Sequence, residues 1–303
     1  MQIAFNKSMK RRAWMGGAIA LTAALGACQN QASPPTKEST EPPSQAVPPA
    51  AEPTALRPAV DSSLQYFQKR AVEHEERCQG LLAAIRKNDL AAAKEAYIAA
   101  RPSYEQIEIL AASFEQTDRD IDARPAVFAL GETDPEFRGA HRIEALLFRD
   151  GALTEAVPYA ETLVQSAQTL IADLNQREAF SAKGHWQGAI ALANEVGAKK
   201  ITSEEETWSD ASLLIFRENW RGIGAIWQAF RELVTDEKVK QEVDAAYQNA
   251  LQTVAGFFRG EDSTQFTPYS QVSLADRQKI VRATNRLRDS LQGAARSLDL
   301  ALS

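Results

Sequence analysis

The sequence predicts an all-α fold. From Ser62 to the end of the chain, apolar residues recur at intervals of three and four, which is the spacing of one face of a helix. Runs of β-branched residues and Gly-Pro turns are both rare in this region. Its length accommodates about eight helices, enough for two packed four-helix bundles. The sequence shows no internal repeat clear enough to indicate a duplication.

The individual helices follow from this spacing and from their caps. The first is predicted from Leu64 to Ile85, and Asn88-Asp89 supplies the cap at which the second begins. Pro102 should kink or break the second helix, which we expect to continue to about Phe114, because proline lacks an amide hydrogen. Further helices are expected over residues 136–148, 158–174, 186–200, 210–233, 237–258 and 274–300.

The chain begins with the parts of a bacterial lipoprotein signal. A basic start precedes a short apolar run and then Leu25-Gly26-Ala27-Cys28, which suits cleavage in front of a lipid-modified Cys28. An uncleaved anchor is the alternative, but the apolar run is shorter than the ~20 residues that span a bilayer. We therefore expect residues 1–28 to be a signal peptide and the protein to be anchored in the periplasm through Cys28. The choices between Sec and twin-arginine export, and between inner and outer membrane, stay open.

The composition of the next segment and the net charge of the chain limit the possible organisation and partners of the protein. Residues 29–60 are rich in Pro, Ser, Thr, Gln, Glu and Ala, so we expect a disordered tether ahead of one helical domain at 61–303. The net charge of −6 falls to about −10 when the four cationic residues of the signal are removed. This balance disfavours nucleic acid and anionic membrane surfaces as partners and suits the binding of cations. Cys78 has no second cysteine to pair with in the mature chain, and its helical setting predicts a small buried side chain.

The strongest candidate site contains one histidine and several acids. His141 and Glu144 are three residues apart, so both side chains can face one ion from a single helix. Such a pair alone is more often a solvated face. Glu105 with Glu108 forms a second pair at this spacing, and Asp118 with Asp122 a third at i, i+4. Acidic pairs on one face repel each other unless a cation lies between them.

Two conditions apply to a common site for these acids. In the alternative without a metal, the acids are neutralised by neighbouring arginines, namely Arg119, Arg124, Arg138 or Arg142. In an unbroken helix, Glu105 and Asp122 would lie about 25 Å apart at 1.5 Å per residue. A shared site therefore requires the chain to break near residues 115–118.

Four segments in a fixed order carry a resemblance to a known family. They are RPSYEQIE at 101–108, DIDAR at 120–124, EFRGAHRIE at 136–144 and KITSEEETWS at 200–209. With them the chain resembles the imelysin-like proteins, and among these most closely the EfeO-type periplasmic component of bacterial Efe iron-uptake systems. The resemblance covers essentially the whole domain from about residue 61 to residue 303.

The resemblance implies a bilobed all-α fold with a metal site in the cleft between the lobes. Carboxylates with one imidazole suit Fe²⁺ or Fe³⁺, with Zn²⁺ or another divalent metal as the alternative. It further implies a monomeric carrier, not an enzyme, which hands iron to a membrane iron permease and associated periplasmic proteins. The positions that match the family's ligands are Glu105, Glu108, Asp122, His141, Glu144 and Glu204.

Two features depart from the family pattern. Many members carry a cupredoxin-like domain ahead of the helical one, and here the Pro-rich segment stands in its place. Asp210 stands where relatives have a histidine, which puts any role of that histidine in doubt.

Two other functions remain open. The imelysin family has been classed with metallopeptidases, but a zinc hydrolase usually offers two histidine ligands. Here only His141 lies in the motif, and we expect His74 and His185 at the surface or at a helix cap. Binding of an acidic polysaccharide, reported in the resembling group, would oppose the chain's own charge. It would need a bridging metal or a basic patch at Arg217, Arg221 and Arg231.

Overall fold

The structure is a computed structural model that describes residues 53–202 and 205–300. Cys28 with the signal peptide, most of the predicted tether and the candidate ligand Glu204 lie outside the described residues. The helical part starts before the boundary predicted at residue 61. A 3₁₀ turn at Thr54–Leu56 leads into α1 (Arg57–Arg86), and Val60 is already buried. Pro58 lies in the first turn of α1, where an amide hydrogen would have no helical partner.

The all-α prediction is confirmed. Within the described residues, the only β structure is an isolated bridge between Phe258 and Phe266. None of the helices in this part of the chain is both long and apolar enough to cross a membrane. After α1 the α-helices are α2 (Leu90–Ile107), α3 (Glu115–Asp122), α4 (Ala140–Glu144), α5 (Leu153–Leu174), α6 (Ala182–Ala198), α7 (Ser212–Phe230), α8 (Glu237–Ala255) and α9 (Leu274–Ser297).

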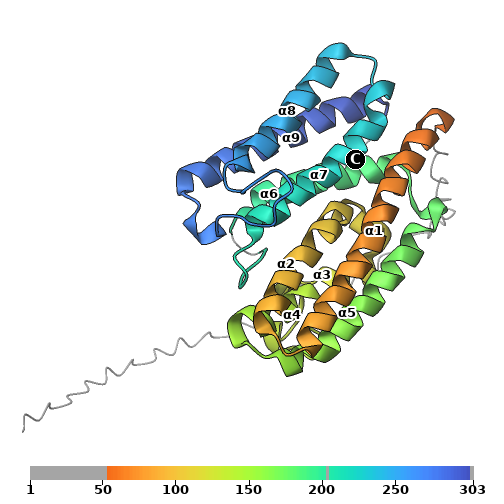
Figure 1. Cartoon of the computed structure of the whole chain (residues 1–303). Helices are drawn as coiled ribbons and strands as arrows, with labels where there is room; N and C mark the ends of the chain where they lie inside the picture. The colour runs from red at the N-terminus through yellow and green to blue at the C-terminus, as the bar shows by residue number, and fades with distance from the viewer. Residues whose placement is uncertain (1–52, 203–204, 301–303) are drawn as a thin grey trace, which may run out of the picture. The chain divides into compact units, whose positions relative to one another are not determined.

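The helices pack in two groups. In the first group, α1 packs along α2 and α5, with the short α3 and α4 beside them (Figure 1). In the second group, α9 packs along α6 and α8, and α7 joins the two groups by contacting α1 and α2 as well as α6 and α8. The first group is thus three long helices with two short ones, not a regular four-helix bundle. The aromatic stripe of α7 lies in the core, where Trp227 and Phe230 meet the ring of Trp186 edge to face.

The second helix does not end at Pro102. α2 runs through Pro102 to Ile107 and then tightens into a 3₁₀ segment at Glu108–Ser113. The chain breaks at Phe114, where φ is −146°, and α3 begins at the next residue. This break lies where a common site for Glu105 and Asp122 requires one.

The start of α4 depends on a glycine. The helix predicted from residue 136 begins only at Ala140, because Gly139 has a φ of +83°, a conformation that side chains disfavour. A Cβ atom at Gly139 would lie 2.4 Å from the carbonyl oxygen of Ile121. The absence of a side chain therefore lets α4 start directly against the end of α3. A π-helical segment, Ala145–Asp150, follows α4, and such segments are frequent at functional sites.

Two histidines expected near the surface are buried. His185 Nδ1 donates a hydrogen bond of 2.9 Å to the carbonyl oxygen of Ser181, and the ring lies among three phenylalanines. His74 bonds the carbonyl of Ala100 at 3.1 Å and lies 3.5 Å from the Cys78 sulfur. Burial lowers the pKa of each histidine to about 4. Cys78 is buried as predicted, which raises the pKa of its thiol to about 12.

Candidate metal site

The fold gathers five of the six predicted ligands from three places in the chain. Glu105 lies in the last turn of α2, and Glu108 begins the 3₁₀ segment that follows. Asp122 ends α3, while His141 and Glu144 lie on α4. All are buried except Glu108, whose side chain is 11% exposed. The break at Phe114 and the close contact at Gly139 together produce this convergence.

The guanidinium group of Arg101 lies at the centre of one half of this set. Arg101 is 2% exposed, and its Nη2 lies 2.6 Å from both Glu105 Oε1 and Asp122 Oδ1. Its Nε donates a hydrogen bond of 2.7 Å to Glu206 Oε1. Sequence reasoning assigned Arg101 no role, although its i, i+4 spacing to Glu105 was a usable signal. Three buried acids thus share one buried cation.

Of the four arginines considered as counter-ions, one enters the site. Arg124 Nη2 lies 2.5 Å from Glu205 Oε2, and Arg124 is held 3.8 Å from Glu195 on α6. The other three contact residues outside the site. Arg138 pairs with an acidic side chain, whereas Arg119 and Arg142 each lie over an aromatic ring.

His141 lies between two carboxylates. Its Nε2 is 3.5 Å from Asp122 Oδ1, and its Nδ1 is 3.4 Å from Glu144 Oε2. Burial lowers the pKa of His141, but the charges and hydrogen bonds of Asp122 and Glu144 outweigh that effect and raise it to about 10. Glu144 also accepts hydrogen bonds from the backbone amides of Trp208 at 2.9 Å and Ser209 at 2.7 Å. Glu144 therefore fixes the segment after residue 204 against α4.

The other half of the set is a cluster of three glutamates. Glu105, Glu108 and Glu205 each offer a carboxylate oxygen, and these oxygens lie within 4.8 Å of one another. Asn219 of α7 supports two of them, because its Nδ2 donates to Glu108 Oε2 at 2.9 Å and to Glu105 Oε2 at 3.1 Å. Carboxylate oxygens at this separation are a donor set for one hard or borderline cation.

Lys200 already provides a positive charge to these glutamates. Its Nζ lies 2.7 and 2.9 Å from the two oxygens of Glu108, 2.8 Å from Glu205 Oε1 and 3.8 Å from Glu105 Oε2. Lys200 itself is fully buried. Burial raises the pKa of Glu105 well above its usual range, whereas Lys200 and Arg124 outweigh burial at Glu205 and lower its pKa.

Besides Arg101, sequence reasoning missed three members of this site. It named Glu204, which is outside the described residues, and passed over Glu205, Glu206 and Lys200 in the same segment. Glu206 is buried between Arg101 and the hydroxyls of Tyr97 and Ser209, and burial together with the charge of Glu144 raises its pKa to about 7. The run of three consecutive glutamates was the only available signal, and it does not say which of them turns inward.

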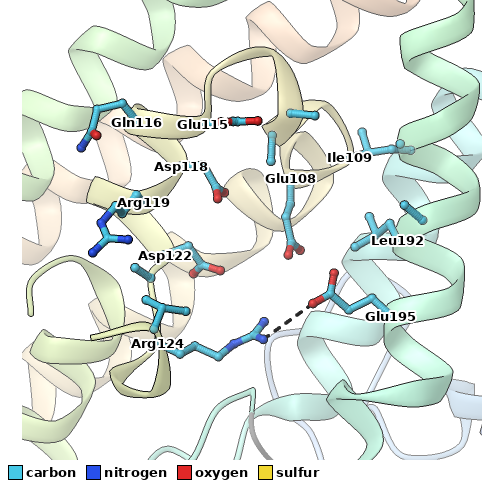
Figure 2. A pocket seen from close by; sticks show the side chains of 16 residues that line it. Glu108, Ile109, Glu115, Gln116, Asp118, Arg119, Asp122, Arg124, Leu192 and Glu195 are labelled. Carbon is cyan, nitrogen blue, oxygen red and sulfur yellow. Dashed lines mark ion pairs between the residues drawn. The ribbon is translucent and has the colours of Figure 1, made fainter. Parts of the chain in front are cut away.

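A cavity of about 630 Å³ leads to the acids from the gap between α3 and α6. Figure 2 shows Glu108, Asp118 and Asp122 turned toward this hollow, with Arg124 and Glu195 paired across one side of it. Asp118 receives a hydrogen bond of 2.5 Å from the Tyr104 hydroxyl, and burial and the charge of Asp122 raise its pKa to about 7. The cavity therefore lies between the two helix groups and reaches Glu108, the least buried of the three glutamates.

The basic patch considered for polysaccharide binding is neutralised by its neighbours. Arg217 Nε donates to buried Glu218 at 2.7 Å, and Arg221 lies 3.2 Å from the same carboxylate. Arg231 pairs with Asp244 at 2.9 Å. These arginines present no uncompensated patch to a polyanion.

Comparisons with known proteins agree with the helical architecture. The sequence profile of the imelysin family matches residues 62–293. An Efem/EfeO family lipoprotein of Staphylococcus haemolyticus is 30% identical over 243 residues, which are 76% of this chain and 83% of that protein. A protein of the same description from Staphylococcus aureus is 28% identical over 79% of this chain and 84% of its own length. The iron uptake system component EfeO of Yersinia pseudotuberculosis is 32% identical over 213 residues, which are 69% of this chain but 55% of EfeO.

Proposed function

The chain belongs to the imelysin family, and from this premise we propose that it is an extracytoplasmic lipoprotein that binds iron and delivers it to a membrane iron permease. The names of its relatives, which are lipoproteins and iron-uptake components, support the coarse role. The observation that carries the proposal is the convergence of Glu105, Glu108 and Glu205 beside a solvent-connected cavity. Three carboxylates match the preference of iron for hard oxygen ligands.

We propose three different parts for the predicted ligands. Glu105, Glu108 and Glu205 would hold the iron. Asp122 and His141 lie beside them but are bound to Arg101 and to each other, so they would balance charge around the site. Glu144 would hold the segment of Glu205 and Glu206 in place through its two backbone hydrogen bonds. Glu204 remains a proposed ligand from the family resemblance.

We propose binding without catalysis. All three histidines lie in the described residues, and only His141 is near the acids, since His74 and His185 are buried among other neighbours. The site therefore does not offer the two histidine ligands usual in a zinc hydrolase. The family carries the name of a peptidase group, while relatives of this chain are named for iron uptake.

Iron binding is tested by titrating the purified, chelator-treated full chain with ferric nitrilotriacetate and measuring protein-bound iron. The parent should bind one iron per chain, and Glu105→Gln or Glu205→Gln should weaken binding at least tenfold because each removes one anionic ligand. Glu115→Gln is the matched control, since Glu115 lines the same cavity but is exposed and lies outside the cluster. No binding by the parent, or equal binding by all variants, would contradict the proposal.

The anchor is tested separately. Cys28→Ala should abolish labelling of the protein by a fatty-acid probe in the native cell and release the protein from the membrane fraction. Lipid labelling that persists in this variant would refute the assignment of Cys28.

A further inference from the structure

Lys200 contacts the same three glutamates that could hold a metal ion. Its Nζ is within 2.9 Å of both oxygens of Glu108 and of one oxygen of Glu205, and 3.8 Å from Glu105. These residues are the ones whose oxygens lie within 4.8 Å of one another. An ammonium group has the charge of a monovalent cation and satisfies the same carboxylates. The buried glutamates are therefore already supplied with a cation by the chain itself.

A metal ion and this ammonium group cannot share the glutamates in the observed arrangement. A bound metal ion would lie at about 2–2.5 Å from each carboxylate oxygen, in the space now facing Nζ. It would place two or three positive charges within a few ångströms of the ammonium charge in a buried setting, where repulsion is strong. Either the lysine leaves or the metal does not enter.

We propose that Lys200 is the resident counter-cation of this site and that iron binds by displacing it. This inference rests on the proposed iron site and adds a residue that sets its selectivity. Without iron, Lys200 neutralises the cluster, because buried like charges without a partner would be strongly destabilising. An incoming ion must compete with Lys200, so only an ion with a high affinity for carboxylates displaces it. Monovalent ions and weakly bound divalent ions are thereby excluded.

The next residue in the chain supplies an internal control for this displacement. Lys199 has a side chain that is 67% exposed, whereas Lys200 is fully buried. An amine-acylating reagent should therefore label Lys199 readily and Lys200 slowly in the iron-free protein. If iron displaces Lys200, its labelling should rise at least tenfold when the chain is loaded with ferric nitrilotriacetate, while labelling of Lys199 stays constant. Peptide mass spectrometry reports both residues from one sample, and metal analysis of that sample reports bound iron.

Substitution gives an independent measurement. Lys200→Met removes the competing charge, so iron affinity should rise at least tenfold, and the iron-free melting temperature should fall and be restored by iron. Lys240→Met is the matched control, because Lys240 is also largely buried and lies 2.8 Å from a glutamate, but on α8. Its iron affinity should equal that of the parent. The labelling experiment uses the unaltered chain and so does not depend on the folding of Lys200→Met.

The outcomes separate this inference from the proposed function. Iron bound with Lys200 exposed supports both. Iron bound with Lys200 still protected, or weaker iron binding by Lys200→Met, overturns the displacement and leaves the iron site standing. Iron bound by Lys200→Met but not by the parent overturns the displacement, because iron then does not displace Lys200, and contradicts iron capture by the native chain. No iron bound by either overturns both.

Discussion

Arg101→Met is the substitution for which the structure makes its sharpest stability prediction. Arg101 is 2% exposed and lies within 2.7 Å of carboxylate oxygens of Glu105, Asp122 and Glu206. Methionine fills a similar volume but carries no charge. The substitution leaves three acids in a buried setting without the cation that they share.

The expected loss follows from the burial of these groups. Removing one partner of a buried ion pair typically costs about 3–5 kcal/mol, because the remaining charge is left uncompensated. At about 2–4 °C per kcal/mol for a domain of this size, the melting temperature should fall by roughly 6–20 °C. The loss should come from the native state, so the slope of the denaturant transition should change little.

The assay is unfolding by guanidinium chloride and by heat on the iron-free full chain at neutral pH. Arg86→Met is the matched control, since Arg86 Nη2 also lies 2.6 Å from a carboxylate, that of Glu161, but its side chain is 57% exposed. An exposed pair of this kind contributes about 0–1 kcal/mol. If Arg101→Met costs no more than Arg86→Met, the guanidinium does not hold the site together and the reasoning fails.

Three other predictions follow from single features. Gly139→Ala should lower the free energy of unfolding by at least about 2 kcal/mol, because it adds backbone strain and a contact of 2.4 Å with the carbonyl oxygen of Ile121. Gly131→Ala is the control, since Gly131 also has a positive φ but an added Cβ would meet no atom of the described chain within 4 Å. An equal loss in Gly131→Ala would refute the role of the close contact. His185 has a pKa of about 4 in the folded protein against about 6.5 when unfolded, so the unfolded chain binds the extra proton and stability falls as the pH drops from about 6.5 to 4. Between pH 7 and pH 5 protonation of His185 should contribute about 2 kcal/mol to the loss of stability, and His185→Phe should remove this contribution. If the pH dependence of stability were the same in His185→Phe as in the parent, the prediction would be wrong. Ferric iron at about 100 times its dissociation constant should stabilise the parent by about 2.7 kcal/mol in the same assay, and a chelator should reverse the shift. No shift on iron loading would contradict a site that is specific to the folded state.

The helices were largely predictable because their signals are local. Apolar spacing located the long helices, and Asp89 caps α2 as expected, accepting a hydrogen bond from the Ala92 amide. The helical segment continues past Pro102 and breaks at Phe114, close to the end predicted for it. One error falls where a tertiary contact overrides a local rule: the helix expected from residue 136 begins only at Ala140, because Gly139 lies against the end of α3. Helix ends are decided by neighbours that the local pattern does not contain.

The candidate site was predictable only in outline. Spacing and resemblance selected Glu105, Glu108, Asp122, His141 and Glu144, and the fold brings all five together. The same reasoning treated them as one ligand set. In the structure Arg101 pairs with Glu105 and Asp122, Lys200 pairs with Glu108 and more distantly with Glu105, and Glu144 pairs with His141. Charge pairing depends on which side chains meet across the fold.

By itself the sequence determined that this protein is helical, where most of its helices lie and which acidic residues share a helix face. These properties depend on side chains three or four residues apart or on ordered motifs that can be read in one dimension. Only the tertiary structure decided that Glu205 turns inward, that His185 is enclosed by phenylalanines and that Lys200 reaches back 92 residues to Glu108. The physical reason is that burial and counter-ion pairing are set by contacts between distant segments. Local spacing does not encode which distant charged side chain will pair with a given residue.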